Sequence, residues 1–247
     1  MLLERHGRLR VIDDELVEHD ARGDPHALLA GYERVPTTAG TFRITPLHPP
    51  DELRRLAAAA EPPLPPRDAL PFDLVELREL EPSIRYDIRY AGDDNFMGFA
   101  LYTEASARMQ RPAAEAVVRV HRAFAAEGLG VVVHDAWRPW RVTKMFWDAT
   151  PEHQHTFVAD PAKGSRHNRG CAIDLSLFEL ASGRVVEMPS GYDEFTERAY
   201  PHWPGGTGAS RDLRDRLRRA MEDEGFAVYD AEWWHYDYPG WERYPVR

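Results

Sequence analysis

The segment Ser165-Arg-His-Asn-Arg-Gly-Cys-Ala-Ile-Asp174 leads from a polar loop into an alternating strand. From Cys171 to Phe178, the odd-numbered residues are apolar and share one face, so Asp174 falls on the other face. An aspartate inside an otherwise apolar strand is costly unless it is paired or coordinates a metal. His167 and Asp174 are therefore candidate metal ligands. The plainer alternative, which this segment alone favours, is an aspartate bonded to neighbouring backbone.

A second polar cluster, Glu232-Trp-Trp-His235, strengthens the metal interpretation. Zinc in a hydrolase takes three protein ligands from His and carboxylate side chains and leaves a fourth position for water. A nearby carboxylate that is not a ligand accepts the proton of that water. His167, Asp174 and His235 fit the ligand set, and Glu232 fits the base. Because residues i and i+3 face opposite sides of an ideal strand, Glu232 and His235 converge only at a bend or bulge.

A third segment, His134-Asp-Ala-Trp-Arg-Pro-Trp-Arg141, places Arg138 where a predicted strand ends, directly before a proline. A residue before proline is held in an extended conformation. A guanidinium fixed in this way is suited to meet a developing oxyanion. Taken alone, however, a surface salt bridge is the more common use of such an arginine.

The composition excludes several classes of function. The chain has 247 residues, of which 43% are hydrophobic and 29% charged, with a net charge of −10. The acidic balance argues against binding nucleic acid or anionic lipid through charge neutralisation. The single cysteine excludes a disulfide framework and a zinc site made of cysteines alone. With neither a signal-peptide pattern nor an 18-residue apolar run, we expect a cytoplasmic protein. The oligomeric state is not readable from the sequence.

The hydrophobic pattern predicts an α+β protein. The expected helices are residues 51–61, with Asp51 as N-cap, 104–127, 140–149 and 210–224. The expected strands are residues 72–80, 130–134, 171–178 and 226–229. Pro62-Pro-Leu-Pro-Pro66 reads as a stiff linker. We therefore divide the chain into an N-terminal extension, residues 1–70, and a catalytic domain, residues 71–247.

The motifs Asp135-x-x-Arg-Pro139, Ser165-x-His-x-x-Gly-x-Ala-x-Asp174 and Glu232-x-Trp-His235 together resemble those of the zinc D-alanyl-D-alanine dipeptidases. Tyr90–Gly98 and Met188–Asp193 resemble two further segments of that family. The resemblance covers roughly residues 72–245. It implies a central antiparallel sheet flanked by helices, a fold shared with zinc D,D-carboxypeptidases and the hedgehog signalling domain.

The resemblance also implies roles for individual residues and a reaction. His167, Asp174 and His235 match the ligands of one Zn²⁺ per chain, and Glu232 matches the catalytic base. Arg138 matches the residue that stabilises the tetrahedral intermediate, Asp193 the one that meets the substrate ammonium, and Ser165 and Tyr90 two substrate-pocket positions. The expected reaction is hydrolysis of D-alanyl-D-alanine or a closely related small dipeptide, with neither nucleic acid nor a membrane as partner.

Two other functions stay open at this point. The nearer one is a D,D- or L,D-carboxypeptidase acting on cell-wall peptides, which would cleave an N-acylated substrate as fast as the free dipeptide. The other is a non-catalytic zinc-binding module, although such a module needs neither a base nor an oxyanion partner.

Three residue types near these motifs depart from the family pattern or could mislead. Arg166, beside the first predicted ligand, replaces a small polar residue, which bears on pocket charge and substrate preference. His153 and His155 could mimic a metal pair, but we expect them to be solvated loop residues. Cys171 is expected to be a small buried packing residue rather than a nucleophile.

Overall fold

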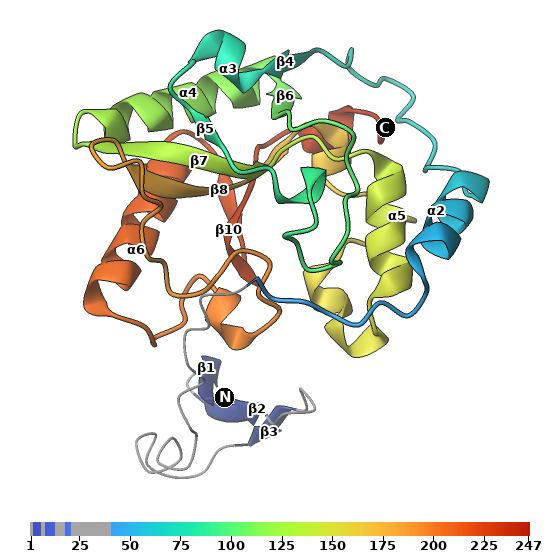
Figure 1. The fold of residues 1–247 in the computed structure, drawn as a ribbon, viewed down its shortest axis with the longest axis horizontal. Coiled ribbons are helices and arrows are strands. Elements are labelled where there is room, and N and C mark those ends of the chain that lie inside the picture. The colour runs from blue at the N-terminus through green and yellow to red at the C-terminus, as the bar shows by residue number, and fades with distance from the viewer. Residues whose placement is uncertain (1, 6–7, 13–17, 21–40) are drawn as a thin grey trace. The chain divides into compact units, whose positions relative to one another are not determined.

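The computed structural model describes residues 2–5, 8–12, 18–20 and 41–247 of the chain (Figure 1). It divides the chain into two compact units, Met1–Ala39 and Gly40–Arg247. In the first unit, the described residues form an antiparallel sheet of three strands, β1 (Leu2–Arg5), β2 (Arg8–Ile12) and β3 (Glu18–Asp20). The predicted N-terminal extension, residues 1–70, thus comprises the first unit, part of which lies outside the described residues, and the beginning of the second unit.

Residues 41–70 contribute a helix to the second unit. Helix α2 (Pro50–Ala59) packs against α5 (Trp140–Ala149) and buries Leu53 completely. The predicted N-cap was wrong, because Pro49 takes that position and Asp51 lies in the first turn, where it pairs with Arg54 at 3.0 Å. A boundary of the catalytic domain at residue 70 stays a prediction.

The burial of Leu53 in α2 predicts how a substitution there changes the stability of the protein. Replacing Leu53 with Ala leaves a cavity in the core, and we expect the free energy of unfolding to fall by about 2–5 kcal/mol in a denaturant titration. Leu64→Ala is the matched control, because the Leu64 side chain in the proline-rich segment is 92% exposed. If both substitutions leave stability unchanged, α2 unfolds separately from the rest of the unit.

The centre of the second unit is a five-stranded sheet with the order β5-β7-β8-β10-β9. Its strands are β5 (Arg85–Tyr86), β7 (Leu129–Asp135), β8 (Ala172–Glu179), β10 (Glu232–Asp237) and β9 (Ala227–Tyr229). All neighbours are antiparallel except β5 and β7, which run parallel. The parallel pair is possible because a long connection containing α4 (Arg111–Ala125) returns the chain to the same end of the sheet. The α+β class is confirmed, with one parallel edge strand added.

Helices cover this sheet, as expected for the class (Figure 1). Helix α4 packs against β7, α6 (Gly208–Asp223) packs against β9 and β10, and the two helices contact each other. In Figure 1, α5 and α2 lie on the other side of β10 from α6. Helix α5 has the predicted bounds. No helix in the described ranges has the length and apolar character needed to cross a membrane.

The expected strand at residues 72–80 is shorter than predicted. Only β4 (Leu74–Glu76) is extended, and the chain then turns into α3 (Leu77–Leu80). Strand β4 pairs with β6 (Arg108–Gln110). Because residues 108–110 pair with β4 as strand β6, helix α4 begins at residue 111 rather than at 104 as predicted. Pro112 suits the first turn of this helix.

The sheet register brings two predicted site residues, Asp174 and His235, into one row with Asp135. Asp135 in β7 is the cross-strand partner of Asp174 in β8, and Asp174 is the partner of His235 in β10. Directly opposed residues of antiparallel strands project their side chains to the same face. The opposite face of β8 carries Ile173, Leu175 and Leu177, which belong to the core. The sheet therefore separates an apolar face under the helices from a polar row that builds the site.

Candidate metal centre and active site

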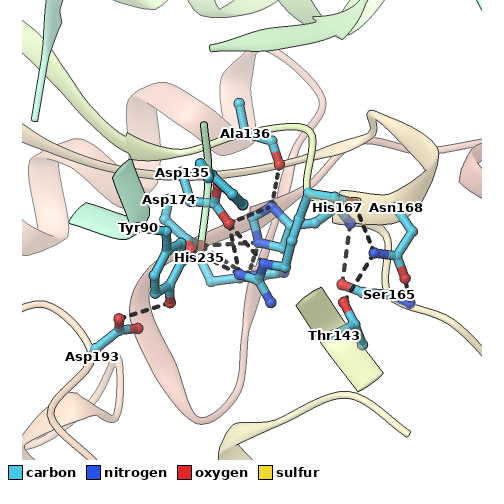
Figure 2. Close-up of polar contacts among 12 residues, drawn as sticks. Tyr90, Asp135, Ala136, Thr143, Ser165, His167, Asn168, Asp174, Asp193 and His235 are labelled. Carbon is cyan, nitrogen blue, oxygen red and sulfur yellow. Dashed lines mark hydrogen bonds and ion pairs between the residues drawn. The ribbon is translucent and has the colours of Figure 1, made fainter. Parts of the chain in front are cut away.

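His167, Asp174 and His235 meet at one point of the described structure (Figure 2). His235 Nδ1 lies 3.0 Å from Asp174 Oδ1 and 3.1 Å from His167 Nε2. His167 Nε2 lies 3.3 Å from Asp174 Oδ1. All three side chains are buried. Asp174 and His235 come from neighbouring strands, whereas His167 comes from the short 3₁₀ helix His167–Arg169 that precedes β8.

The outer contacts of the two histidines assign which ring nitrogen carries the proton. His167 Nδ1 lies 2.6 Å from the carbonyl oxygen of Ala136, which only accepts, so Nδ1 donates and Nε2 is left unprotonated. His235 Nε2 lies 3.0 Å from Asp237 Oδ1, so that nitrogen donates and Nδ1 is left unprotonated. Two nitrogen lone pairs therefore face each other across 3.1 Å, beside the Asp174 carboxylate. This arrangement is repulsive unless a positive charge lies between them. Although burial opposes it, Asp237 and Asp174 raise the pKa of His235 well above its usual value, so a second ring proton supplies that charge when no metal ion does.

The donor set fits zinc. Tetrahedral zinc with ligand bonds of about 2.0–2.1 Å requires ligand atoms roughly 3.3 Å apart, close to the three separations in this cluster. Asp174 Oδ1 is buried and has no hydrogen-bond donor among the described residues, although burial penalises its charge. Burial alone would raise the pKa of Asp174, but positive charge on the neighbouring His167 and His235 rings, in the place that a metal ion would take, holds it well below the usual value. The carboxylate is thus ionised and open toward the two ring nitrogens.

Glu232 reaches the cluster through an irregularity in β10. The pairing of β10 with β9 shifts register between Glu232 and Tyr236, so three residues of β10 have no counterpart on β9. The bulge brings Glu232 Oε2 to 3.8 Å from His235 Nδ1, as the convergence of these two residues requires. Burial, with the nearby Asp174 carboxylate, raises the pKa of Glu232 to about 8. A cation at the cluster would favour its ionised form.

Arg138 is buried against the cluster rather than exposed in a surface salt bridge. Its Nε donates to Asp135 Oδ2 at 2.8 Å, and its Nη2 lies 3.6 Å from Asp174 Oδ2. The guanidinium also stacks over Phe146, with Cζ 4.8 Å from the ring centroid. The backbone N–H of Arg138 donates to the carbonyl of His167, which ties the arginine to the first ligand. The guanidinium is therefore held in one orientation beside the cluster.

Asp193 and Tyr90 form a second polar group on the other side of the ligands from Ser165 (Figure 2). Tyr90 Oη donates to Asp193 Oδ2 at 2.7 Å. Burial, and then the charge of Asp174, raises the pKa of Asp193 well above its usual value. Asp193 is also the one non-glycine residue with positive φ, at 56°, among those described. A strained, desolvated carboxylate of this kind is suited to receive a cationic group.

A family model described as D-ala-D-ala dipeptidase, of the M15 peptidases, matches residues 71–246. The chain belongs to this family. It is 34% identical over 174 residues to the D-alanyl-D-alanine dipeptidase of Escherichia coli K12, covering 70% of this chain and 89% of that one. It is 33% identical over 181 residues to the enzyme of the same name from Enterococcus faecium, covering 65% and 88%. A solved structure of the LdcB LD-carboxypeptidase matches with a TM-score of 0.41 and 19% identity, covering 70% of this chain and 71% of that one.

As a member of the D-ala-D-ala dipeptidase family, the protein is a peptidase, and the described cluster lines a single cavity of about 90 Å³. Every predicted site residue borders this cavity, namely Tyr90, Arg138, Ser165, His167, Asp174, Asp193, Glu232 and His235. The hydroxyl of Ser165 accepts from the backbone N–H of His167 at 3.2 Å, which leaves its own proton free for another acceptor. The segment from Thr156 to Ala159 forms a further wall.

Three supporting residues of this family member were given no role from the sequence. Asp135 holds Arg138, Asp237 holds His235, and the Tyr192 hydroxyl donates to Asp174 Oδ2 at 3.0 Å. Asp237 could have been found, because residue i+2 on a strand shares the face of a ligand at i, and ligand histidines are commonly oriented by a carboxylate. Tyr192 gives no such signal, since its partner lies 18 residues away in sequence.

Cys171, His153 and His155 were not expected to bind a metal, and the structure places the three in different environments. Cys171 is buried, which raises the pKa of its thiol to about 12, in keeping with a packing role. His153 is exposed as expected. His155 is not simply solvated, because its ring packs on Trp147 and its Nε2 lies 2.9 Å from the carbonyl of Thr150. Neither histidine belongs to a metal cluster within the described part of the chain.

Proposed function

We propose that this protein hydrolyses D-alanyl-D-alanine, or a closely related small dipeptide, to free amino acids in a zinc-dependent reaction. The observation that carries the proposal is the set of three donor atoms within 3.3 Å of one another, with the buried carboxyl group of Glu232 3.8 Å from His235 Nδ1. A structural site would close its fourth position with another ligand, whereas this one opens onto a cavity. The family assignment supports the same reaction class.

Each group of residues around the cavity has a separate role in the proposed reaction. Zinc held by His167, Asp174 and His235 would supply a Lewis acid that acidifies water and polarises the scissile carbonyl. Glu232 accepts the proton of the attacking water and later delivers it to the leaving amine. Arg138 donates hydrogen bonds to the carbonyl oxygen as negative charge develops on it, and its contact with Asp135 removes the need to reorient.

Asp193 provides the selectivity for a free dipeptide. Its carboxylate is buried, faces the cavity and lacks a cationic partner at hydrogen-bond distance among the described residues, so a substrate ammonium would supply the missing charge. Tyr90 keeps the carboxylate in place. A carboxypeptidase acts on an acylated nitrogen and has no use for such a group, so this carboxylate favours the dipeptidase over the carboxypeptidase alternative.

One comparison tests the proposed reaction and its selectivity together. D-Ala-D-Ala and N-acetyl-D-Ala-D-Ala are assayed with the purified protein, with and without a zinc chelator. We expect the free dipeptide to be cleaved at least about 100-fold faster in terms of kcat/KM, because an acylated nitrogen leaves the buried Asp193 unpaired. Chelation should abolish both reactions, and added zinc should restore them.

The outcomes separate the alternatives. If N-acetyl-D-Ala-D-Ala is cleaved with the same kcat/KM as D-Ala-D-Ala, the protein acts as a carboxypeptidase rather than a dipeptidase. Activity that survives complete removal of metal would contradict the zinc-dependent mechanism. Full zinc occupancy with no turnover of either substrate would overturn the proposed reaction.

A further inference from the structure

Arg166 is a cation whose terminal nitrogens have no protein partner. It directly precedes His167 and lines the cavity. Its Nε lies 3.4 Å from Asp237 Oδ2, and its Cζ lies 4.7 Å from the ring centroid of Trp241. Neither terminal nitrogen forms a hydrogen bond to another residue of the 41–247 range, and Nε is itself buried without one. The guanidinium is thus anchored at one edge and free at the other.

The second arginine of the cavity lining is already engaged. Arg138 directs Nε and Nη2 to Asp135 and lies close to Asp174. It is also buried, whereas 41% of the Arg166 side chain remains exposed. Arg166 is therefore the lining cation that can offer two parallel N–H donors to an incoming anion without breaking an existing hydrogen bond.

The cavity is polarised along its length. Asp193 and Ser165 lie on opposite sides of the three ligands (Figure 2), and Arg166 follows Ser165 in the chain. The cavity lining thus includes a carboxylate held by Tyr90 and a guanidinium held by Asp237 and Trp241, with no contact between the two charged groups among the described residues. A zwitterionic dipeptide has its ammonium and carboxylate at opposite ends, with the scissile bond between them. The charges of the cavity match those of such a substrate lying across the ligands.

We propose that Arg166 binds the free α-carboxylate of the substrate and so restricts hydrolysis to peptides whose leaving residue is the C-terminal one. This assignment rests on the proposed function, because it takes a small dipeptide as the substrate. The bidentate pairing of a guanidinium with a carboxylate gives both affinity and orientation. Asp237 and Trp241 fix the arginine beforehand, so little side-chain freedom is lost on binding.

The test compares D-Ala-D-Ala with its C-terminal amide, D-Ala-D-alaninamide, in the wild type, Arg166→Gln and Arg166→Lys. We expect Arg166→Gln to lower kcat/KM for the free acid about 10- to 100-fold, mainly through KM, and to leave the amide within about threefold. Arg166→Lys should retain part of the preference for the free acid over the amide, since lysine keeps the positive charge but lacks the two parallel N–H donors of the guanidinium. Lys163→Gln, at a side chain that is 84% exposed, controls for the loss of a nearby positive charge.

Two further measurements separate binding from indirect effects. Zinc content is determined for each variant, because Arg166 touches Asp237 and Asp237 orients His235. Calorimetric binding of acid and amide is measured in the Glu232→Gln background, which reports on Arg166 even without turnover. A preference for the acid that disappears with Arg166→Gln at unchanged zinc content supports the assignment. Equal losses for acid and amide, or an undiminished preference, overturn it, whereas normal binding without wild-type turnover counts against the proposed reaction alone.

Discussion

Glu232→Gln should lower kcat by about 10²- to 10⁴-fold while the protein keeps its zinc and its fold. The amide has nearly the same shape as the carboxyl group but cannot accept a proton from water. No described residue donates a hydrogen bond to the Glu232 carboxylate, so the substitution disturbs only its 3.8 Å approach to His235 Nδ1. Stopped-time assays on D-Ala-D-Ala, metal analysis and thermal unfolding on the same preparations provide the measurement.

The matched control for this variant is Glu152→Gln, at an exposed position of the 3₁₀ helix Glu152–Phe157. It removes the same charge from the protein and should leave kcat and zinc content unchanged. A Glu232→Gln variant that retains most of its activity would exclude this residue as the base. A variant that loses both activity and zinc would mean that Glu232 acts in binding the metal.

The second large effect is expected at Arg138. Arg138→Lys should lower kcat by about 10²- to 10³-fold with a much smaller change in KM, because the hydrogen bond to the carbonyl oxygen strengthens only as charge develops there. A lysine ammonium cannot stay on Asp135 and point to the carbonyl at the same time, as the forked guanidinium does. Steady-state kinetics on the free dipeptide, with unfolding temperatures for each variant, provide the measurement.

Asp135→Asn is the companion variant, because it leaves the guanidinium in place but weakens the bond that aims it. We expect a loss of about tenfold in kcat, smaller than that of Arg138→Lys and in the same parameter. A rise in KM at constant kcat for both variants would instead assign Arg138 to ground-state binding. If Arg138→Lys fails to fold, the split between kcat and KM in Asp135→Asn still decides the question.

The candidate metal ligands, which the structure brings together, could be named from the sequence because they are residue types that stand out locally. An aspartate on the polar face of an apolar strand and a histidine in the preceding loop indicate a candidate ligand pair, but only together with Glu232-Trp-Trp-His235 and the family resemblance does the metal interpretation become the favoured one. Helix α5 was predictable for a similar reason, since Pro139 sets its beginning and apolar spacing its length.

Contacts that depend on strand register or on the path of a loop could not be predicted from the sequence. Asp135 reaches the site because β7, β8 and β10 align it with Asp174 and His235, and a shift of one residue would turn it to the other face. Tyr192 meets Asp174 from a loop whose path no local pattern indicates. The parallel strand β5 has only two residues, too few to show a period.

The convergence of Glu232 with His235 was a conditional prediction, because the sequence alone does not show whether β10 contains a bulge. The three residues of β10 without a counterpart on β9 are visible only once both strands are paired. The candidate ligands were therefore accessible from their motifs and the family resemblance, whereas the placement of their neighbours required the sheet.

The bulge in β10 also sets a limit on how this segment can change over evolutionary time. Substitutions at Trp233 or Trp234 would alter packing, since both rings are buried, but they would leave the number of residues between Glu232 and His235 intact. A deletion or insertion of a single codon there would rotate Glu232 away from the ligands in one step. We expect this stretch to tolerate replacement of its side chains far better than any change in its length.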